Sequence, residues 1–96
     1  MTRVVVVAPL RPGTRDDVQA HLESGPPFDL GATKLGDHRV FLTEHEAVFV
    51  FEGPDARKEV EKLLGEPGVW RTAEAWRNWL ADRPRLAGEV FGWTRD

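Results

Sequence analysis

Three histidines are the side chains of this chain best suited to proton transfer, because an imidazole titrates near neutral pH. His38 is the most informative of them, since it starts an apolar stretch. If residues 38–42 and 47–51 pair as a hairpin, His38 lies opposite Phe51 on an apolar face. Loss of solvent there would lower the pKa of His38 and leave a neutral imidazole able to act as a base or to orient a ligand.

The histidines also have simpler explanations. His38 can be a hydrogen-bonded or solvated side chain near a strand end, and both interpretations stay open. His21 lies three residues after Val18, near the apolar face of a predicted helix, and is the second candidate base. His45 falls in the predicted hairpin loop. No metal site is expected, because the carboxylates close to His38 and His45 look exposed to solvent.

All four tryptophans lie in the last third of the chain. Two of them are three residues apart on one predicted helix, so both are expected to face inward. Such side chains suit the wall of a pocket for a flat apolar or aromatic molecule, in which an arginine would fix a carbonyl or carboxylate. They equally suit the filling of a small core or a dimer contact. The candidate ligand-binding residues are Trp70, Trp76, Trp79, Phe49, Phe51, Arg39 and Arg77.

The elements that position these residues can be read from hydrophobic periodicity and from turn residues. The pattern predicts four strands and three helices in the order β-α-β-β-α-(α)-β. Thr14 is the expected N-cap of the first helix, which ends at Gly25. The predicted strands cover residues 3–9, 38–42, 47–51 and 89–93, and the predicted helices cover residues 14–24, 54–64 and 72–82.

This order predicts an α+β fold of the ferredoxin-like kind, a single domain over residues 1–96 with an antiparallel four-stranded sheet of order 4-1-3-2. The two runs that are apolar at every position, Val4–Ala8 and Ala47–Phe51, then become the central strands. Helices cover only one face of such a sheet. The other face would leave a large apolar patch exposed, which is rare on monomers. We therefore expect a two-fold homodimer with the sheets packed face to face.

At this point the chain resembles the dimeric α+β barrel superfamily, which includes antibiotic-biosynthesis monooxygenase-like, A/B-barrel and YCII-like proteins. The strand and helix order carries the resemblance, together with the segment VFVFEG leading into a helix. It implies a ligand cavity between the sheet and the helices. The first strand, Val4–Ala8, lacks the Asn of the monooxygenases and the His of the A/B-barrel proteins. His21 and Asp37 are similar in placing to two YCII-like positions, and no subfamily is identified.

Composition narrows the classes of function. The chain has 96 residues, a formal charge of −3 and no massed basic residues, so a nucleic-acid surface is not expected. It has no cysteine, which excludes disulfides, thiolate metal sites and a cysteine nucleophile. We expect a cytoplasmic protein without a membrane partner, because no secretory pattern precedes the first strand. No cofactor is expected, since no phosphate-binding, dinucleotide-binding or zinc motif occurs.

Three hypotheses for function remain. The first is a dimeric barrel that binds a small apolar or aromatic molecule, as a carrier or as an accessory protein of secondary metabolism. The second is a cofactor-independent monooxygenase or isomerase, in which His38 or His21 takes a proton and Trp or Arg side chains stabilise the anion. The third is a non-catalytic structural or interaction protein.

Overall fold

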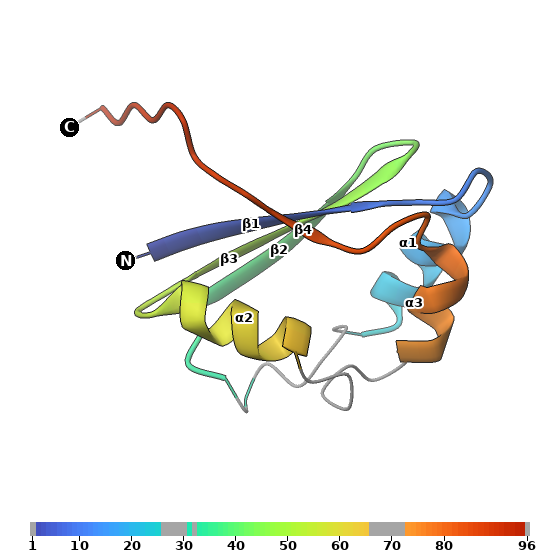
Figure 1. The fold of residues 1–96 in the computed structure, drawn as a ribbon, viewed down its shortest axis with the longest axis horizontal. Helices are drawn as coiled ribbons and strands as arrows, with labels where there is room; N and C mark the ends of the chain where they lie inside the picture. The colour runs from blue at the N-terminus through green and yellow to red at the C-terminus, as the bar shows by residue number, and fades with distance from the viewer. Residues whose placement is uncertain (1, 26–30, 32, 66–72, 96) are drawn as a thin grey trace.

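The structure, a computed structural model, describes residues 2–25, 31, 33–65 and 73–95. The described part is a mixed α+β fold with one four-stranded antiparallel sheet and three helices, compatible with a ferredoxin-like fold (Figure 1). None of its helices has the length and apolar character needed to cross a membrane. In chain order the elements are β1 (Thr2–Pro9), α1 (Arg15–Glu23), β2 (Asp37–Leu42), β3 (Glu46–Gly53), α2 (Ala56–Gly65), α3 (Ala73–Trp79) and β4 (Arg85–Ala87).

The strands lie in the order β2-β3-β1-β4, so both all-apolar runs occupy the centre of the sheet, as the sequence predicts. β1 and β3 pair antiparallel along their whole length, from Thr2 opposite Gly53 to Pro9 opposite Glu46. A central strand is buried on both faces more than an edge strand, which is why these two runs can be apolar throughout.

The hairpin of β2 and β3 has the predicted register. Leu42 lies opposite Ala47, Val40 opposite Phe49 and His38 opposite Phe51. The turn forms without an Asn-Gly pair because Thr43 supplies the contacts. Its N–H donates to the carbonyl of Glu46 at 2.9 Å, and its hydroxyl accepts from the N–H of His45 at 3.3 Å.

The entry into β2 depends on a close approach to Gly53 at the end of β3. A Cβ at Gly53 would lie 3.1 Å from the backbone N of Gly36 and 3.2 Å from the Cα of Leu35. The N–H of Gly36 donates to the carbonyl of Glu52 at 2.8 Å. Glycine is therefore needed here for space, since a side chain would push against backbone atoms.

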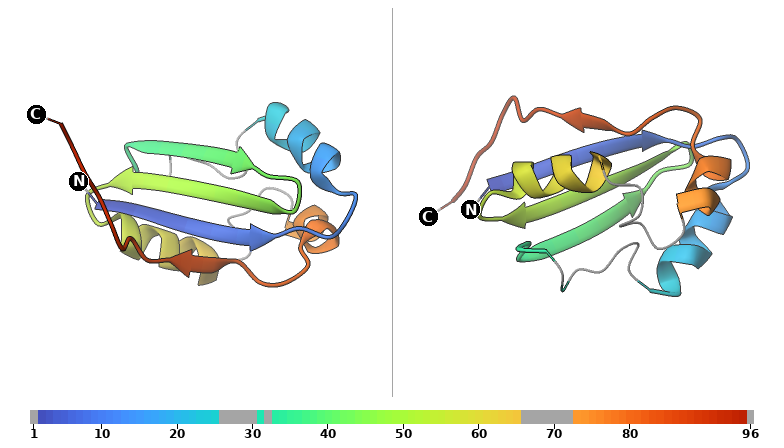
Figure 2. Two further views of the ribbon diagram at one scale, coloured as in Figure 1. Left: turned by 90° about the horizontal axis from the view of Figure 1, so that it is seen from above. Right: turned by 60° about the horizontal axis from the view of Figure 1, so that its bottom comes forward.

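All three helices lie on one side of the sheet (Figures 1 and 2). α2 packs under β1 and β3, whereas α1 and α3 gather where β1 ends. Two backbone hydrogen bonds tie the end of α3 to the end of β1. The N–H of Arg11 donates to the carbonyl of Trp79 at 2.7 Å, and the N–H of Ala81 donates to the carbonyl of Pro9 at 2.8 Å.

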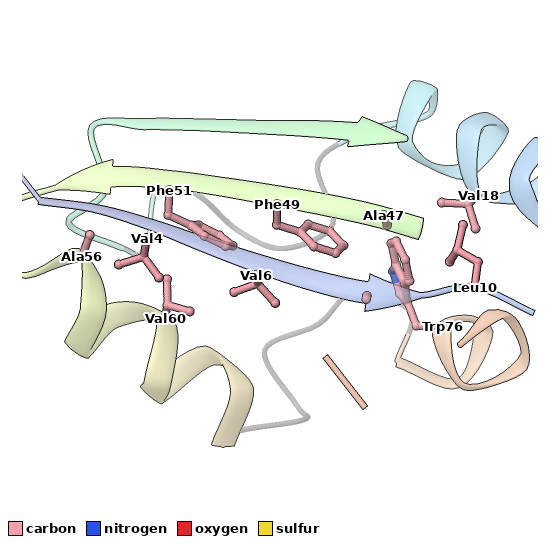
Figure 3. Close-up of a cluster of buried hydrophobic side chains, with 11 residues drawn as sticks. Val4, Val6, Leu10, Val18, Ala47, Phe49, Phe51, Ala56, Val60 and Trp76 are labelled. Atoms are coloured by element: carbon pink, nitrogen blue, oxygen red, sulfur yellow. The ribbon is translucent and has the colours of Figure 1, made fainter. Parts of the chain in front are cut away.

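The hydrophobic core lies between the sheet and the helices (Figure 3). Alternation along the strands places every second residue of β1 and β3 on this helix-covered face. The core residues are Val4, Val6, Ala8, Leu10, Val18, Ala47, Phe49, Phe51, Ala56, Val60 and Trp76.

The opposite face, here called the outer face, has no helix over it (Figure 2). Its apolar residues alternate with the core residues along the strands. The valines among them are half-buried by their neighbours in the sheet, and the phenylalanine is 56% exposed. These residues are Val5, Val7, Val48, Val50 and Phe41.

The prediction for the last strand was wrong. The alternation of Glu89–Trp93 indicated a strand, but β4 is Arg85–Ala87, with Val7 opposite Arg85 and Val5 opposite Ala87. The reason is the length of the partner strand. If the register continued, β1 would end opposite residue 90, so most of the alternating segment has no strand to pair with.

The end of α3 also differs from the prediction. α3 ends at Trp79 rather than near residue 82, because Leu80 forms a β-bridge with Leu10 instead of continuing the helix. Thr14 is the N-cap residue of α1, as predicted, although its hydroxyl makes no cap bond to the helix and donates to the carbonyl of Arg11 at 2.7 Å.

Candidate functional site

Six of the nine candidate residues form one chain of ring contacts on the helix-covered side of the sheet. Strand pairing brings the first three together, since His38 lies opposite Phe51 and Phe49 shares their face. Helical spacing brings the two tryptophans onto neighbouring turns of α3. We call this set the aromatic row. Its members, in order of contact, are His38, Phe51, Phe49, Trp76, Trp79 and His21.

His38 is stacked on the phenylalanines of β3. Its ring centroid is 4.4 Å from that of Phe51, with 17° between the planes, and 6.4 Å from that of Phe49. Its Nδ1 lies 3.1 Å from the carbonyl oxygen of Val50. A carbonyl can only accept, so Nδ1 carries the proton in this hydrogen bond. In the neutral ring, Nε2 is then the basic nitrogen.

Burial lowers the pKa of His38 from its ordinary value, because the charged imidazolium loses solvent. The hydrogen bond to the Val50 carbonyl and the negative charge of Asp37 act in the opposite direction and are outweighed. His38 is therefore a neutral imidazole at neutral pH. A neutral, partly desolvated imidazole with a hydrogen-bonded Nδ1 is the state that a general base requires.

The tryptophans link the sheet to the two helices at its end. The ring of Trp76 lies 5.6 Å from Phe49 and 5.4 Å from Trp79, and it meets Trp79 at 76°. His21 approaches Trp79 at 5.2 Å and 61°, and Trp76 at 6.0 Å and 84°. Edge-to-face contacts of this kind stabilise aromatic pairs by more than the burial of their surface alone.

The members of the aromatic row differ in exposure. Phe49, Phe51 and Trp76 are 3%, 2% and 5% exposed, so they belong to the core. His21, His38 and Trp79 are half-buried. The half-buried rings are the part of the row that a small molecule would reach first.

The three remaining candidate residues are not brought into the row. Arg39 lies opposite Val50, on the outer face, and its Nε is 3.1 Å from an oxygen of Asp37. Arg77 is exposed on α3. Trp70 lies outside the described residues. Neither arginine therefore stands beside His38, and the basic partner that the sequence suggested for a carboxylate is not part of the row.

The surroundings of the row include one residue that sequence reasoning missed. Leu35 is half-buried and packs against the core although it lies in a loop, between Lys34 and Gly36. A lone apolar residue has no periodicity to reveal it. Within the described residues, no three His, Asp or Glu side chains gather as a metal site would require. The row thus consists of rings with aliphatic core side chains packed around them, and its polar atoms are supplied by two imidazoles and two indoles.

Comparison with known proteins adds no relative from which a function could be transferred. No family model matches the chain, and no curated protein and no solved structure matches it. A fold of this general kind serves many functions, so function has to be inferred from the site itself.

Proposed function

We propose that this chain is a homodimeric α+β barrel of ferredoxin-like subunits and that each subunit binds a small apolar or aromatic molecule between its sheet and its helices. The observation that carries the proposal is the aromatic row, which runs from β2 to α1 and ends in half-buried rings at both sides. Aromatic and aliphatic walls with a few polar atoms are the usual lining of small-molecule sites.

The chemistry of the row selects the kind of ligand. Flat rings favour stacked or edge-on contact with another aromatic system, and the absence of a charged side chain in the row disfavours a small ionic ligand. His38 and His21 are the polar members that would orient the molecule.

The outer face supports the dimer. It presents a strip of valines in the middle of the sheet and Phe41 on β2, with ion pairs at its margin, Arg3 with Glu52 and Arg39 with Asp37. A second copy of the same face would cover the strip and leave the ion pairs at the rim, as in ordinary interfaces.

Native mass spectrometry of freshly purified protein tests both parts. The expected mass is that of two chains of 10.8 kDa plus a passenger that leaves on activation. Trp79→Ala should reduce the retained passenger, while Asn78→Ala, an exposed neighbour on α3, should not. A single-chain mass would contradict the dimer. A dimer that retains nothing, and whose tryptophan emission does not respond to the uncharged aromatic probe N-phenyl-1-naphthylamine, would contradict the ligand site.

A second function is favoured by one observation, the neutral His38 whose Nδ1 is held by the Val50 carbonyl. In this alternative the protein is a cofactor-independent isomerase or monooxygenase. His38, or His21, would remove a proton from a carbon next to a carbonyl, and the electron pair would move to the carbonyl oxygen. Only His21 is in contact with the indole rings, those of Trp76 and Trp79. An isomerase would return the proton to another carbon, and a monooxygenase would use dioxygen as co-substrate.

Exchange of substrate hydrogen with D₂O, once the passenger is identified, tests this alternative. Wild-type protein should catalyse exchange at the acidic carbon, and His38→Gln should lower the rate by about 100-fold or more. Undiminished exchange in His38→Gln, in His21→Gln and in the double variant would remove both proposed bases.

A further inference from the structure

Among the residues that the structure describes, three of the five large apolar side chains left exposed lie on one short segment, residues 90–93. Residues 88–95 belong to no helix or strand. Val90, Phe91 and Trp93 are 99%, 80% and 67% exposed, whereas Phe41 and Leu86 are the other large apolar side chains left exposed in the described part of the chain. We call residues 89–95 the arm. A scattered exposed Leu or Val needs no explanation, but two aromatic rings and a valine on one short segment do.

The arm runs away from the hydrophobic core of its own subunit. After β4, the chain rises on the side of the sheet opposite the helices, beyond the start of β1 (Figure 1). The view from above agrees, since the chain passes in front of the sheet at that end (Figure 2). Seven extended residues span about 23 Å, and two sheets packed face to face lie about 10 Å apart. The arm is long enough to cross to a second sheet and to lie along it.

The exposed apolar area of the arm is large enough to contribute to association between subunits. An aromatic side chain offers roughly 150–250 Å² for burial, so the exposed parts of Phe91 and Trp93 together amount to about 300 Å². A stable interface buries about 800 Å² on each partner. The valines of the outer face are already half-buried by their neighbours and have less left to contribute. Two rings of the arm would therefore supply more than a third of the area that a stable dimer needs.

We infer that the arm of each subunit packs against the margin of the outer face of a second copy of this chain, beside the sheet-to-sheet contact, with Phe91 and Trp93 as its anchors. The inference rests on the proposed face-to-face dimer and names the segment that completes it. The margin matches the arm in chemistry, since Phe41 is exposed there and the charged side chains form ion pairs with one another, Arg3 with Glu52 and Arg39 with Asp37. An arm with Glu89 and Arg95 of opposite charge meets no uniform repulsion there.

Sedimentation equilibrium tests the inference through the dissociation constant of the dimer. Phe91→Ser and Trp93→Ser should each weaken the dimer by about 30-fold or more, because aromatic anchors dominate interfaces. Thr94→Ala, a polar position on the same arm, should leave the constant unchanged. The variants should keep the wild-type circular dichroism spectrum, since Phe91 and Trp93 lie outside the hydrophobic core.

A photocrosslink identifies the surface that the arm contacts. A benzophenone amino acid at Thr94, beside Trp93, is irradiated in a refolded mixture of ¹⁴N- and ¹⁵N-labelled protein. Crosslinked peptides should join an arm of one label to the margin of the other subunit's outer face, at β2 or the first residues of β1. Crosslinks confined to one label would place the arm on its own subunit and overturn the inference.

The outcomes distinguish a failure of the proposed role of the arm from a failure of the proposed dimer. A wild-type dimer whose dissociation constant is unchanged by Phe91→Ser and Trp93→Ser would leave the proposed dimer standing and overturn the role of the arm. A wild-type protein that is monomeric at every concentration would overturn both.

Discussion

His38 shows at the scale of one residue how a strand position sets the ionisation of a side chain. Pairing with Phe51 puts the imidazole on the helix-covered face, and the Val50 carbonyl holds its Nδ1. Its sequence neighbour Arg39 points to the outer face and stays in an exposed ion pair. Two adjacent basic residues thus have different environments because alternation along a strand separates them.

The lowered pKa of His38 predicts a dependence of stability on pH. The unfolded chain, with a histidine pKa near 6.5, binds a proton before the folded protein does. The free energy of unfolding should therefore be independent of this group above about pH 6.5 and should fall as the pH drops from there towards the lower folded pKa. Urea unfolding from about pH 7.5 to about pH 5 measures this.

His38→Leu should flatten that part of the profile, because it removes the titrating group. His45→Gln, which removes an exposed histidine from the hairpin loop, is the matched control. Parallel profiles for the wild type and His38→Leu over this range would show that His38 does not carry the effect.

At the scale of elements, the helices are held by few contacts. α2 is fastened to β1 and β3 through Ala56 and Val60, which are 0% and 1% exposed. Charged residues lie between and beside them on the helix, including an Arg57–Glu61 pair at 3.1 Å. Such an exposed pair contributes little to stability, so apolar packing has to hold the helix.

Val60→Ala should lower the free energy of unfolding by about 2 kcal/mol, through lost burial of two carbon groups and the cavity that they leave. Lys58→Ala, on the exposed side of the same helix, should change it by less than about 0.5 kcal/mol. Urea denaturation of both variants makes the comparison. Equal effects of the two substitutions would mean that α2 is not anchored through Val60.

For the whole molecule, the proposed dimer depends on the outer face. A charge placed in the middle of this face would be buried without a partner in both subunits of a two-fold dimer. Val48→Glu, at a position opposite Val7 and Phe41, should therefore weaken the proposed dimer by at least about 100-fold, equivalent to about 2.7 kcal/mol. Light scattering coupled to size-exclusion chromatography over a dilution series measures the change.

Gln19→Glu is the matched control, since it adds the same charge at an exposed position of α1. It should leave association unchanged. If Val48→Glu remained as dimeric as the wild type, the outer face would not be the interface.

The sequence by itself determined the centre of the sheet and the hairpin. Runs that are apolar at every position have only one stable place in such a fold, between two strands, and a two-residue loop leaves the hairpin one register that keeps Phe49 and Phe51 on the inner face. These features depend on local pattern, which is why β1, β3 and the His38–Phe51 pair were predictable. Leu35 was not, because one apolar residue in a loop has no pattern.

Only the tertiary structure decided where the last elements end and which rings meet. Glu89–Trp93 alternates like a strand, but a strand needs a partner, and β1 does not extend far enough to pair with it. α3 stops at Trp79 because Leu80 bridges to Leu10, seventy residues earlier in the chain. The contact of His21 with Trp76 and Trp79 likewise joins distant segments. Such contacts depend on the position of a remote partner, which no local periodicity encodes.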